Sequence, residues 1–287
     1  MKTGSIRPIL MFLLPALLCA CTEEERTASL PLPLEVSACI AANDGKPQTR
    51  TEPTLTEANY DRKEFEEGDV IKITKAGNTA TDALYRNDGT HWKIYSGGTP
   101  LTTTGGDSFT ALFPRDFTAI QEDQTNITGF FNSNKLQATA TSVDNHLALS
   151  FTHVFAKITL VITYATETTP NIAEIEGIGM RSGTTGTKTE KVSLYRTSGS
   201  TTGKQHSYVG IVHPGDYKNS KYTIRVTTGT TGSTETKSYT EKDEARLVLL
   251  AGYNYQFTFT TTNELILTGV TISEFDAQPE TDTGSAT

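Results

Sequence analysis

Few residues of this chain combine a reactive side chain with a spacing that would let it do chemistry. Five histidines lie far apart, and none stands at metal-ligand spacing from another histidine or from a cysteine: His91, His146, His153, His206 and His213. Gly199-Ser200 and Gly232-Ser233 lack the Gly-x-Ser-x-Gly frame of an activated serine. The acidic stretch 64–69 lacks the spacing of a calcium loop, and no glycine-rich phosphate loop precedes a helix. We therefore predict no catalytic residue, no metal and no cofactor, and a protein that is not an enzyme.

One pattern does predict covalent chemistry, and it surrounds Cys21. Lys2 and Arg7 flank the start of an apolar run, Ile9 to Leu18, that is too short to span a bilayer. Residues 1–20 therefore have the order of parts of a signal peptide. Leu18-Cys19-Ala20-Cys21 resembles a bacterial lipobox, which implies cleavage before Cys21 and acylation of its thiol and new amine, for example with palmitate. The alternative is an ordinary signal peptide with an unrelated cysteine.

Residues 21–29 read as a tether for the lipid anchor. Glu23, Glu24 and Glu25 follow Cys21 closely, which resembles the surface-export signal of Bacteroidetes lipoproteins. The triplet could equally serve only to solvate a tether. The resemblance implies a lipoprotein of the cell outer membrane that faces outward. Once Cys21 is acylated, Cys39 is the one ordinary thiol left, and we expect it to be a small strand residue.

Composition excludes one large class of partner. The 287 residues carry a net charge of −8, and the lysines and arginines are scattered. A nucleic-acid-binding surface needs clustered cations to neutralise phosphates, so we expect no nucleic acid partner. With 36% hydrophobic and 20% charged residues, the chain has the composition of a globular protein.

The dominant periodicity beyond the tether is that of β-strands. Alternate residues from 30 to 40 are apolar and are expected to share one face of a strand: Leu30, Leu32, Leu34, Val36, Ala38 and Ile40. Pro31 and Pro33 lack N–H donors, so the first half of this strand should lie at a sheet edge. Near the end of the chain, a second alternation breaks at Gly269 as a bulge would: Leu265, Leu267, Val270 and Ile272.

Many more short strands, separated by turn residues, predict an all-β fold of the antiparallel sandwich class. The segment 147–164 could be one long strand or two strands with a bend. Residues 115–143 are weakly patterned and could hold a short helix. We predict two β-sandwich domains in tandem, at 30–146 and 147–275, followed by a polar tail at 276–287.

Several segments, in order, resemble the fimbrillin family of Bacteroidetes (the Mfa-like, type V pilins). They are the lipobox at Cys21, the apolar strand 30–41, Thr49-Arg50-Thr51, Phe65-x-x-Gly68-Asp69-x-Ile71-x-Ile73, Tyr85, Trp92, Phe109-x-Ala111-x-Phe113-Pro114, Leu149-x-Phe151-x-His153-x-Phe155-Ala156-Lys157-Ile158 and Leu250-x-Gly252-x-x-Tyr255-x-Phe257. Together they cover nearly the whole mature chain. The segment Ile272-Ser273-Glu274-Phe275 departs from the family, which has Trp near this point.

The resemblance implies a structural and adhesive subunit of a surface fimbria, or pilus, with two transthyretin-like sandwich domains. It implies proteolysis in the loop after the first strand, here between Arg50 and Thr51, and loss of that strand. The vacated groove, formed where residues 30–41 had lain, would accept a strand from another fimbrial subunit. Unpaired backbone beside an apolar trench is a template for strand addition. The candidate donor is Leu265–Ile272, which could equally be the last strand of its own domain.

The main alternative is a monomeric surface lipoprotein that binds glycans of host or bacterial cells. Trp92 and nearby Tyr95 could stack on a sugar, although Trp92 could instead be a core residue. A surface hydrolase is the third reading, and it lacks a nucleophile or metal set.

Overall fold

The computed structural model describes residues 30–41, 63–77, 81–183, 186–197, 203–230 and 233–275. Strands make up 59% and helix 3% of the structure, which confirms the all-β class. By its contacts the chain divides into two units, Met1–Leu30 and Pro31–Thr287. All strands of the described residues belong to the second unit.

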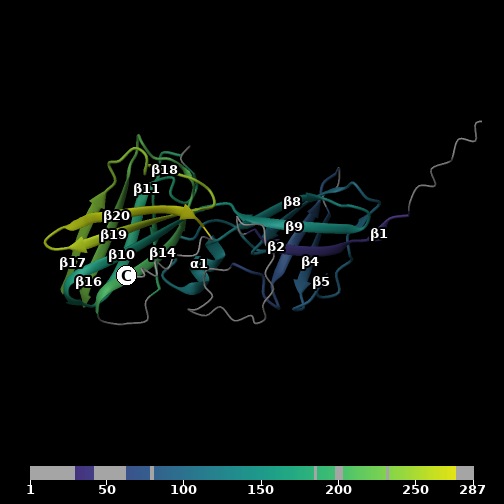
Figure 1. The fold of residues 1–287 in the computed structure, drawn as a ribbon, viewed down its shortest axis with the longest axis horizontal. Helices are drawn as coiled ribbons and strands as arrows, with labels where there is room; N and C mark the ends of the chain where they lie inside the picture. Colours follow the sequence, from purple (N-terminus) through teal and green to yellow (C-terminus); the bar gives the residue numbers. More distant parts are fainter. Residues whose placement is uncertain are drawn as a thin grey trace, which may run out of the picture. The chain divides into compact units, whose positions relative to one another are not determined.

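The first group of strands forms a closed seven-stranded sheet. Its members, in order around the sheet, are β2 (Glu35–Ile40), β5 (Trp92–Ile94), β4 (Thr81–Asn87), β3 (Val70–Lys75), β7 (Ser108–Phe113), β8 (Leu136–Thr141) and β9 (His146–His153). Neighbours are antiparallel, except that β9 closes the sheet by pairing in parallel with β2 (Figure 1). A further pair, β1 (Leu32–Pro33) and β6 (Thr102–Thr103), lies beside it as a separate ribbon.

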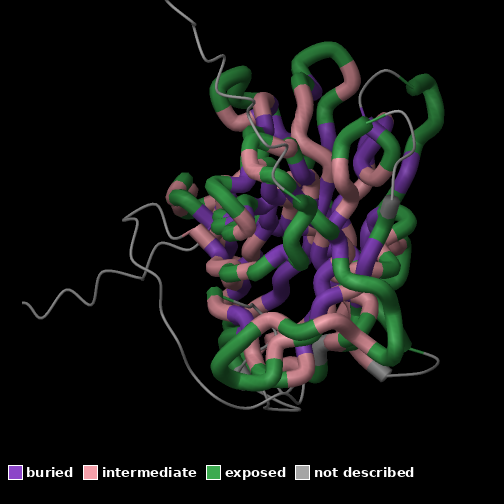
Figure 2. The backbone as a smooth tube through the Cα atoms, turned by 90° about the vertical axis from the view of Figure 1, so that its right-hand side faces the viewer, coloured by how far each residue is buried: buried purple, intermediate pink, exposed green. Residues whose placement is uncertain are grey.

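Period-two alternation fills the interior of the closed sheet. In β7, the side chains of Phe109, Ala111 and Phe113 are buried and alternate with more exposed residues. Phe65, which precedes β3, meets Phe113 and Phe151 edge-on at 5.3 and 5.1 Å between ring centroids. Figure 2 shows the buried segments running through the interior while exposed residues gather in the connecting loops.

The second group of strands forms two sheets over one core. One sheet has the order β13 (Tyr195–Arg196), β14 (Gly203–Val212), β10 (Ala156–Thr168), β19 (Tyr253–Thr261) and β20 (Leu265–Glu274). The other has the order β12 (Thr189–Ser193), β11 (Pro170–Ile178), β16 (Tyr222–Thr230) and β17 (Ser233–Thr240). A short pair, β15 (Gly215–Asp216) with β18 (Val248–Leu249), lies outside these sheets. Ile158, Ile175 and Phe257 come from both sheets and share one apolar cluster, as in a sandwich.

The change from one core to the other comes later than the predicted boundary at residue 146. Leu147, Leu149 and Phe151 of β9 enter the core of the closed sheet, whereas Phe155 and Ile158 enter the second core. A division at 146/147 would separate β9 from the sheet that it closes. The segment 147–164 is therefore two strands, with the break at Val154–Phe155.

The weakly patterned segment 115–143 holds helix α1 (Ile127–Ser133) and strand β8. Asn126 caps α1, and its side-chain oxygen accepts a hydrogen bond from the Gly129 N–H at 2.9 Å. Two consecutive residues of α1 pack into different cores. Phe130 is buried in the second core, and Phe131 packs against the first.

Gln124 holds the segment that precedes α1 against β14. Its buried side-chain amide donates to the carbonyl of Ile211 at 2.9 Å and accepts from the N–H of Ile211 at 2.8 Å. The amide thus pairs with β14 as a strand residue would.

Candidate strand-exchange interface

The strand predicted to be exchanged lies in two pieces, β1 and β2. β1 pairs only with β6, through Leu32 opposite Thr103 and Pro33 opposite Thr102. The prolines therefore lie in an edge ribbon, as their missing N–H groups require. β2 pairs with β9 over six residues, from Glu35 opposite His146 to Ile40 opposite Phe151.

On its other side, β2 is held by a single pair. Val36 lies opposite Trp92 of β5, and no other residue of β2 pairs with β5. The closed sheet therefore has a seam along β2 and β5. A strand that is paired fully on one side and sparsely on the other loses fewer hydrogen bonds on leaving than a central strand does.

The side chains of this segment divide into a buried and an exposed part. Leu34 and Ile40 are each 5% exposed, and Val36 and Ala38 are partly buried against the same core. The expectation of six apolar side chains on one buried face is wrong for Leu30 and Leu32, which are 82% and 52% exposed. β1 belongs to the outer ribbon, so its side chains do not reach the interior of the closed sheet.

Backbone hydrogen bonds to two loops fix the junction between β1 and β2. Leu34 N–H donates to the carbonyl of Leu101 at 2.8 Å, and Glu35 N–H donates to the carbonyl of Asn145 at 2.8 Å. Glu35 also lies 3.2 Å from His146, in a pair that is exposed and therefore contributes little. At the far end, Ala41 N–H donates to the carbonyl of Phe151 at 2.7 Å.

The remaining sequence predictions near this segment have mixed outcomes. Cys39 is a partly buried strand residue with its Sγ 3.8 Å from the Leu149 carbonyl, as expected. Trp92 packs against the core and meets Phe65 edge-on at 5.1 Å, so its core reading is confirmed. Cys21, Arg50 and Thr51 lie outside the described residues.

The candidate donor segment is β20, and here it completes its own sheet. It pairs with β19 from Leu265 opposite Thr261 to Glu274 opposite Tyr253, with a register shift beside Gly269 as predicted. Leu265 is buried, Leu267 and Val270 are partly buried, and Ile272 is 47% exposed. β20 is an edge strand, so its second row of backbone groups has no partner strand in this sheet.

Contacts made by Phe275, the residue that follows β20, hold the end of this strand in place. Phe275 stacks on the buried ring of His153 at 3.6 Å between centroids, and its carbonyl accepts a hydrogen bond from Lys157 Nζ at 3.1 Å. Asn134 in turn contacts His153 Nδ1 at 2.9 Å. His153 is therefore a buried histidine with a structural role.

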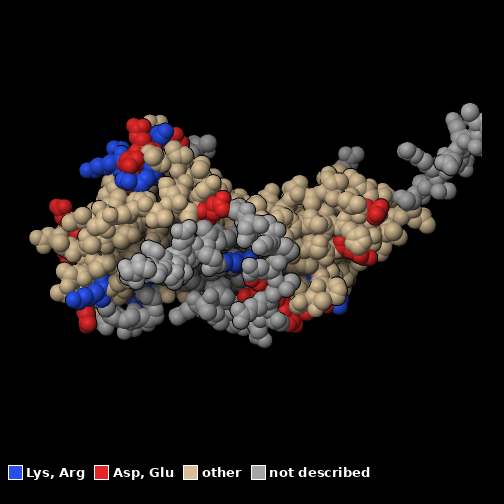
Figure 3. Space-filling model, in the orientation of Figure 1, with Lys and Arg blue, Asp and Glu red and all other residues tan. Residues whose placement is uncertain are grey.

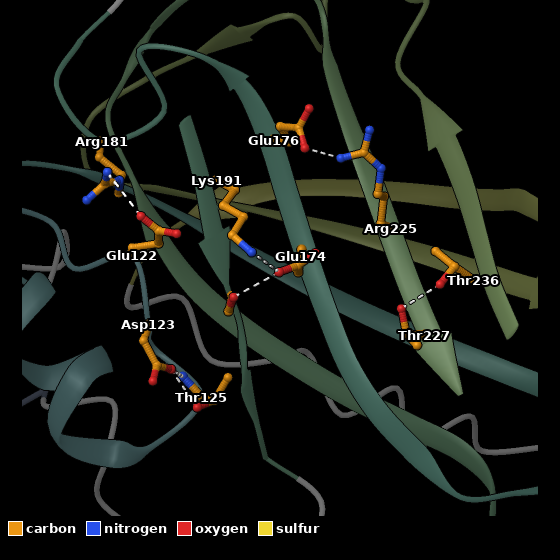
Figure 4. A network of polar contacts seen from close by, with 11 residues as sticks. Glu122, Asp123, Thr125, Glu174, Glu176, Arg181, Lys191, Arg225, Thr227 and Thr236 are labelled. Carbon is orange, nitrogen blue, oxygen red and sulfur yellow. Dashed lines mark hydrogen bonds and ion pairs between the residues drawn. The ribbon is translucent and has the colours of Figure 1, made fainter. Parts of the chain in front are cut away.

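Charged side chains elsewhere on the second sandwich pair with one another (Figure 4). Lys191 donates to Glu174 at 3.0 Å, and this carboxylate raises the pKa of Lys191. Arg225 pairs with Glu176 on the neighbouring strand. Charges of both signs lie side by side on the face that Figure 3 draws.

Within the described ranges, no group of three His, Cys, Asp or Glu residues could hold a metal ion. The same residues include no helix long and apolar enough to cross a membrane.

A family model described as fimbrillin-like matches residues 49–274. The chain belongs to the fimbrillin-like family. This membership supports a role as a fimbrial or adhesive subunit at the cell surface, in contact with other fimbrial subunits, and a structural function without catalysis. No curated protein sequence matches this fimbrillin-like chain.

Solved structures similar to the fimbrillin-like chain come from species of Bacteroides and Porphyromonas. A proposed cell adhesion protein of Bacteroides ovatus matches with a TM-score of 0.62 and 16% identity, over 87% of this chain and 100% of that one. Another, from Bacteroides uniformis, has a TM-score of 0.56 and 14% identity, over 85% and 98%. A fimbrial anchor protein of Porphyromonas gingivalis matches more distantly, with a TM-score of 0.43 and 9% identity over 85% and 98%. At these identities the first two matches show a shared fold and nothing further.

Proposed function

We propose that this chain is a structural and adhesive subunit of a cell-surface fimbria, exported as a lipoprotein precursor and joined to its neighbours by β-strand exchange. The observation that carries the proposal is the position of β2. This strand closes the first sheet and covers its core. It pairs along one side with β9, and on the other side a single residue pair joins it to β5.

Loss of this strand would leave a site that requires another strand. Burial of each apolar side chain such as Leu34 or Ile40 contributes roughly 1.5–3 kcal/mol. Without Leu34 and β2, the core beneath that strand would meet water, and the β9 edge would present unpaired N–H and C=O groups. An apolar trench beside an open sheet edge favours addition of a strand from another chain.

Three sequence features complete the proposed route. Acylation of Cys21 would anchor the precursor in the outer membrane, and the following glutamates would direct it to the surface. Cleavage between Arg50 and Thr51 would separate β1 and β2 from the remaining chain. We also propose that both halves are of the transthyretin-like sandwich type, a reading supported by the two facing sheets of the second half.

We propose β20 as the donor strand, because it is an edge strand with alternating apolar residues on both sides of its bulge. As donor it would have to leave β19, so the groove of the next subunit must offset that lost pairing. Deletion of everything after Thr262 tests this assignment. Truncated subunits that still polymerise would rule β20 out as the donor.

The proposal as a whole is tested by a controlled cut. A cleavage site for a sequence-specific protease replaces residues 48–54 of the full chain, and the chain is analysed before and after digestion by SDS gel without boiling. We expect a monomer before the cut and SDS-resistant ladders after it. A variant without the inserted site is the control. If the cut chain stays monomeric at every concentration, strand exchange is wrong for this protein.

A further inference from the structure

Phe275, directly after β20, ties the end of that strand to the junction between the two cores. Its side chain is buried, and its ring lies nearly parallel to that of His153, with 14° between the ring planes. Lys157 Nζ donates to its carbonyl and also lies 4.2 Å from the centre of its ring, within cation–π range. Its N–H donates to the carbonyl of Gly252 at 2.7 Å. An aromatic stack, a cation–π contact and two hydrogen bonds therefore hold the end of β20.

His153 is the last residue of β9, the strand that borders the proposed groove. On one side, β9 pairs with β2 from His146 to Phe151. On the other side, its pairing with β8 in the described structure is limited to Thr152 and His153. Loss of β2 would therefore leave residues 146–151 without a partner strand. The strand pairing of β9 would then be confined to the end where His153 stacks on Phe275.

We propose that Phe275, His153 and Lys157 form a latch that keeps the candidate donor β20 in its own sheet while β2 occupies the groove. β2 fixes β9, β9 positions His153, and His153 and Lys157 retain Phe275. When β2 leaves, β9 loses the pairing with this strand, so His153 gains freedom and its stack on Phe275 weakens. The subunit then opens its groove and frees its donor strand together. This inference rests on the proposed strand exchange and names what controls release of the donor.

Coupling between two sites is reciprocal, so the latch can be tested from the side of β20 in the uncut chain. Hydrogen exchange of the full, unacylated Cys21→Ala chain, followed by mass spectrometry of its peptides, reports the opening of each strand separately. Phe275→Ala removes the aromatic stack and the cation–π contact. We expect amide exchange to rise at least about tenfold in β20. In residues 146–151 of β9, it should rise at least about fivefold.

Leu265→Ala is the matched control, because Leu265 is buried in the same strand at the end away from Phe275. It should raise exchange in β20 and leave exchange in residues 146–151 unchanged. Equal effects of the two substitutions on β9, or no rise in β9 with Phe275→Ala, would overturn the proposal. If Phe275→Ala does not fold, Phe275→Leu takes its place, since leucine keeps much of the apolar volume and loses the ring stack. It should raise exchange in residues 146–151 above the value for Leu265→Ala.

A second measurement starts from the groove. Ile40 is buried in β2 opposite Phe151, two residues before His153, so Ile40→Ala weakens the hold of β2 on this end of β9. It should raise amide exchange at the end of β20 at least about fivefold, and less than about twofold when Phe275→Ala is already present. The same increase with and without Phe275→Ala would show that the latch does not carry the effect. Neither measurement needs a polymer, whereas SDS-resistant ladders after the controlled cut test strand exchange by itself, so the two proposals can fail separately.

Discussion

Replacing single leucines in the first strand tests how that strand holds the precursor together. Leu34 and Leu32 are two residues apart and differ in burial, with Leu34 in the core of the closed sheet and Leu32 on the outer ribbon. Leu34→Ala removes buried apolar volume and leaves a cavity, which costs about 2–5 kcal/mol in protein cores. We expect about 3 kcal/mol for Leu34, since the seam beside β2 lets the site relax in part. Leu32→Ala should change stability by no more than about 0.5 kcal/mol.

The chain contains one tryptophan, which lies at the position that reports this change. Trp92 is the residue opposite Val36 across the seam, so its fluorescence follows unfolding of the closed sheet. Urea denaturation of the uncleaved chain, followed by this fluorescence, gives the midpoint of unfolding. With a slope of about 2 kcal/mol per molar urea, a loss of about 3 kcal/mol lowers the midpoint by about 1.5 M. Equal midpoints for Leu34→Ala and Leu32→Ala would refute the assignment of Leu34, the residue just before β2, to the core of the closed sheet.

Three further predictions concern other parts of the chain. Gln124→Ala leaves the N–H and the carbonyl of Ile211 without their partner, which should destabilise the second core by roughly 1–3 kcal/mol for each group, measured by thermal unfolding. Gln121→Ala is the control, and equal effects of the two substitutions would contradict the role of Gln124. Burial raises the pKa of Glu241, but its ion pair with Arg246 and two backbone N–H groups outweigh this and lower it. Ionised Glu241 therefore stabilises the folded chain above its ordinary pKa of 4.5, and this stabilisation is lost as the pH falls through the lower pKa of the folded state. Glu241→Gln should make the melting temperature fall less steeply as the pH is lowered. A profile equal to that of the unchanged chain would contradict this role of Glu241. Cys21→Ala should abolish incorporation of radiolabelled palmitate, and equal labelling of both chains would contradict acylation at this residue.

The sequence predicted best the strands in which apolar and polar residues alternate regularly and one face covers a core. β3 and β19 carry β-branched or aromatic residues at every second position, and β7 alternates Phe109, Ala111 and Phe113 in the same way, so all three agree with the predicted all-β pattern. The alternation from 30 to 40 was as clear, yet Leu30 and Leu32 are exposed. A period of two indicates which residues share a face, but what covers that face depends on β6 and β9, which lie far away in the sequence.

Elements that depend on distant partners were missed for the same reason. β17 is a polar edge strand of threonines, serines and charged residues, so no apolar pattern marks it. Gln124 is polar in a polar segment, and only its contact with Ile211 explains why it is fully buried. Residues 113–118 at the end of β7 and residues of α1 line one pocket, and no spacing in the sequence predicts that they meet.

The first residue of subunits taken from surface filaments tests the central claim most directly. Filaments sheared from cells would be purified, and their subunits analysed by N-terminal sequencing and intact mass. The account predicts subunits that begin at Thr51, so that the segment holding β1 and β2 is absent and a strand of a neighbouring subunit has replaced it. Subunits that still begin at Cys21, with that segment retained in the filament, would contradict strand exchange at this site.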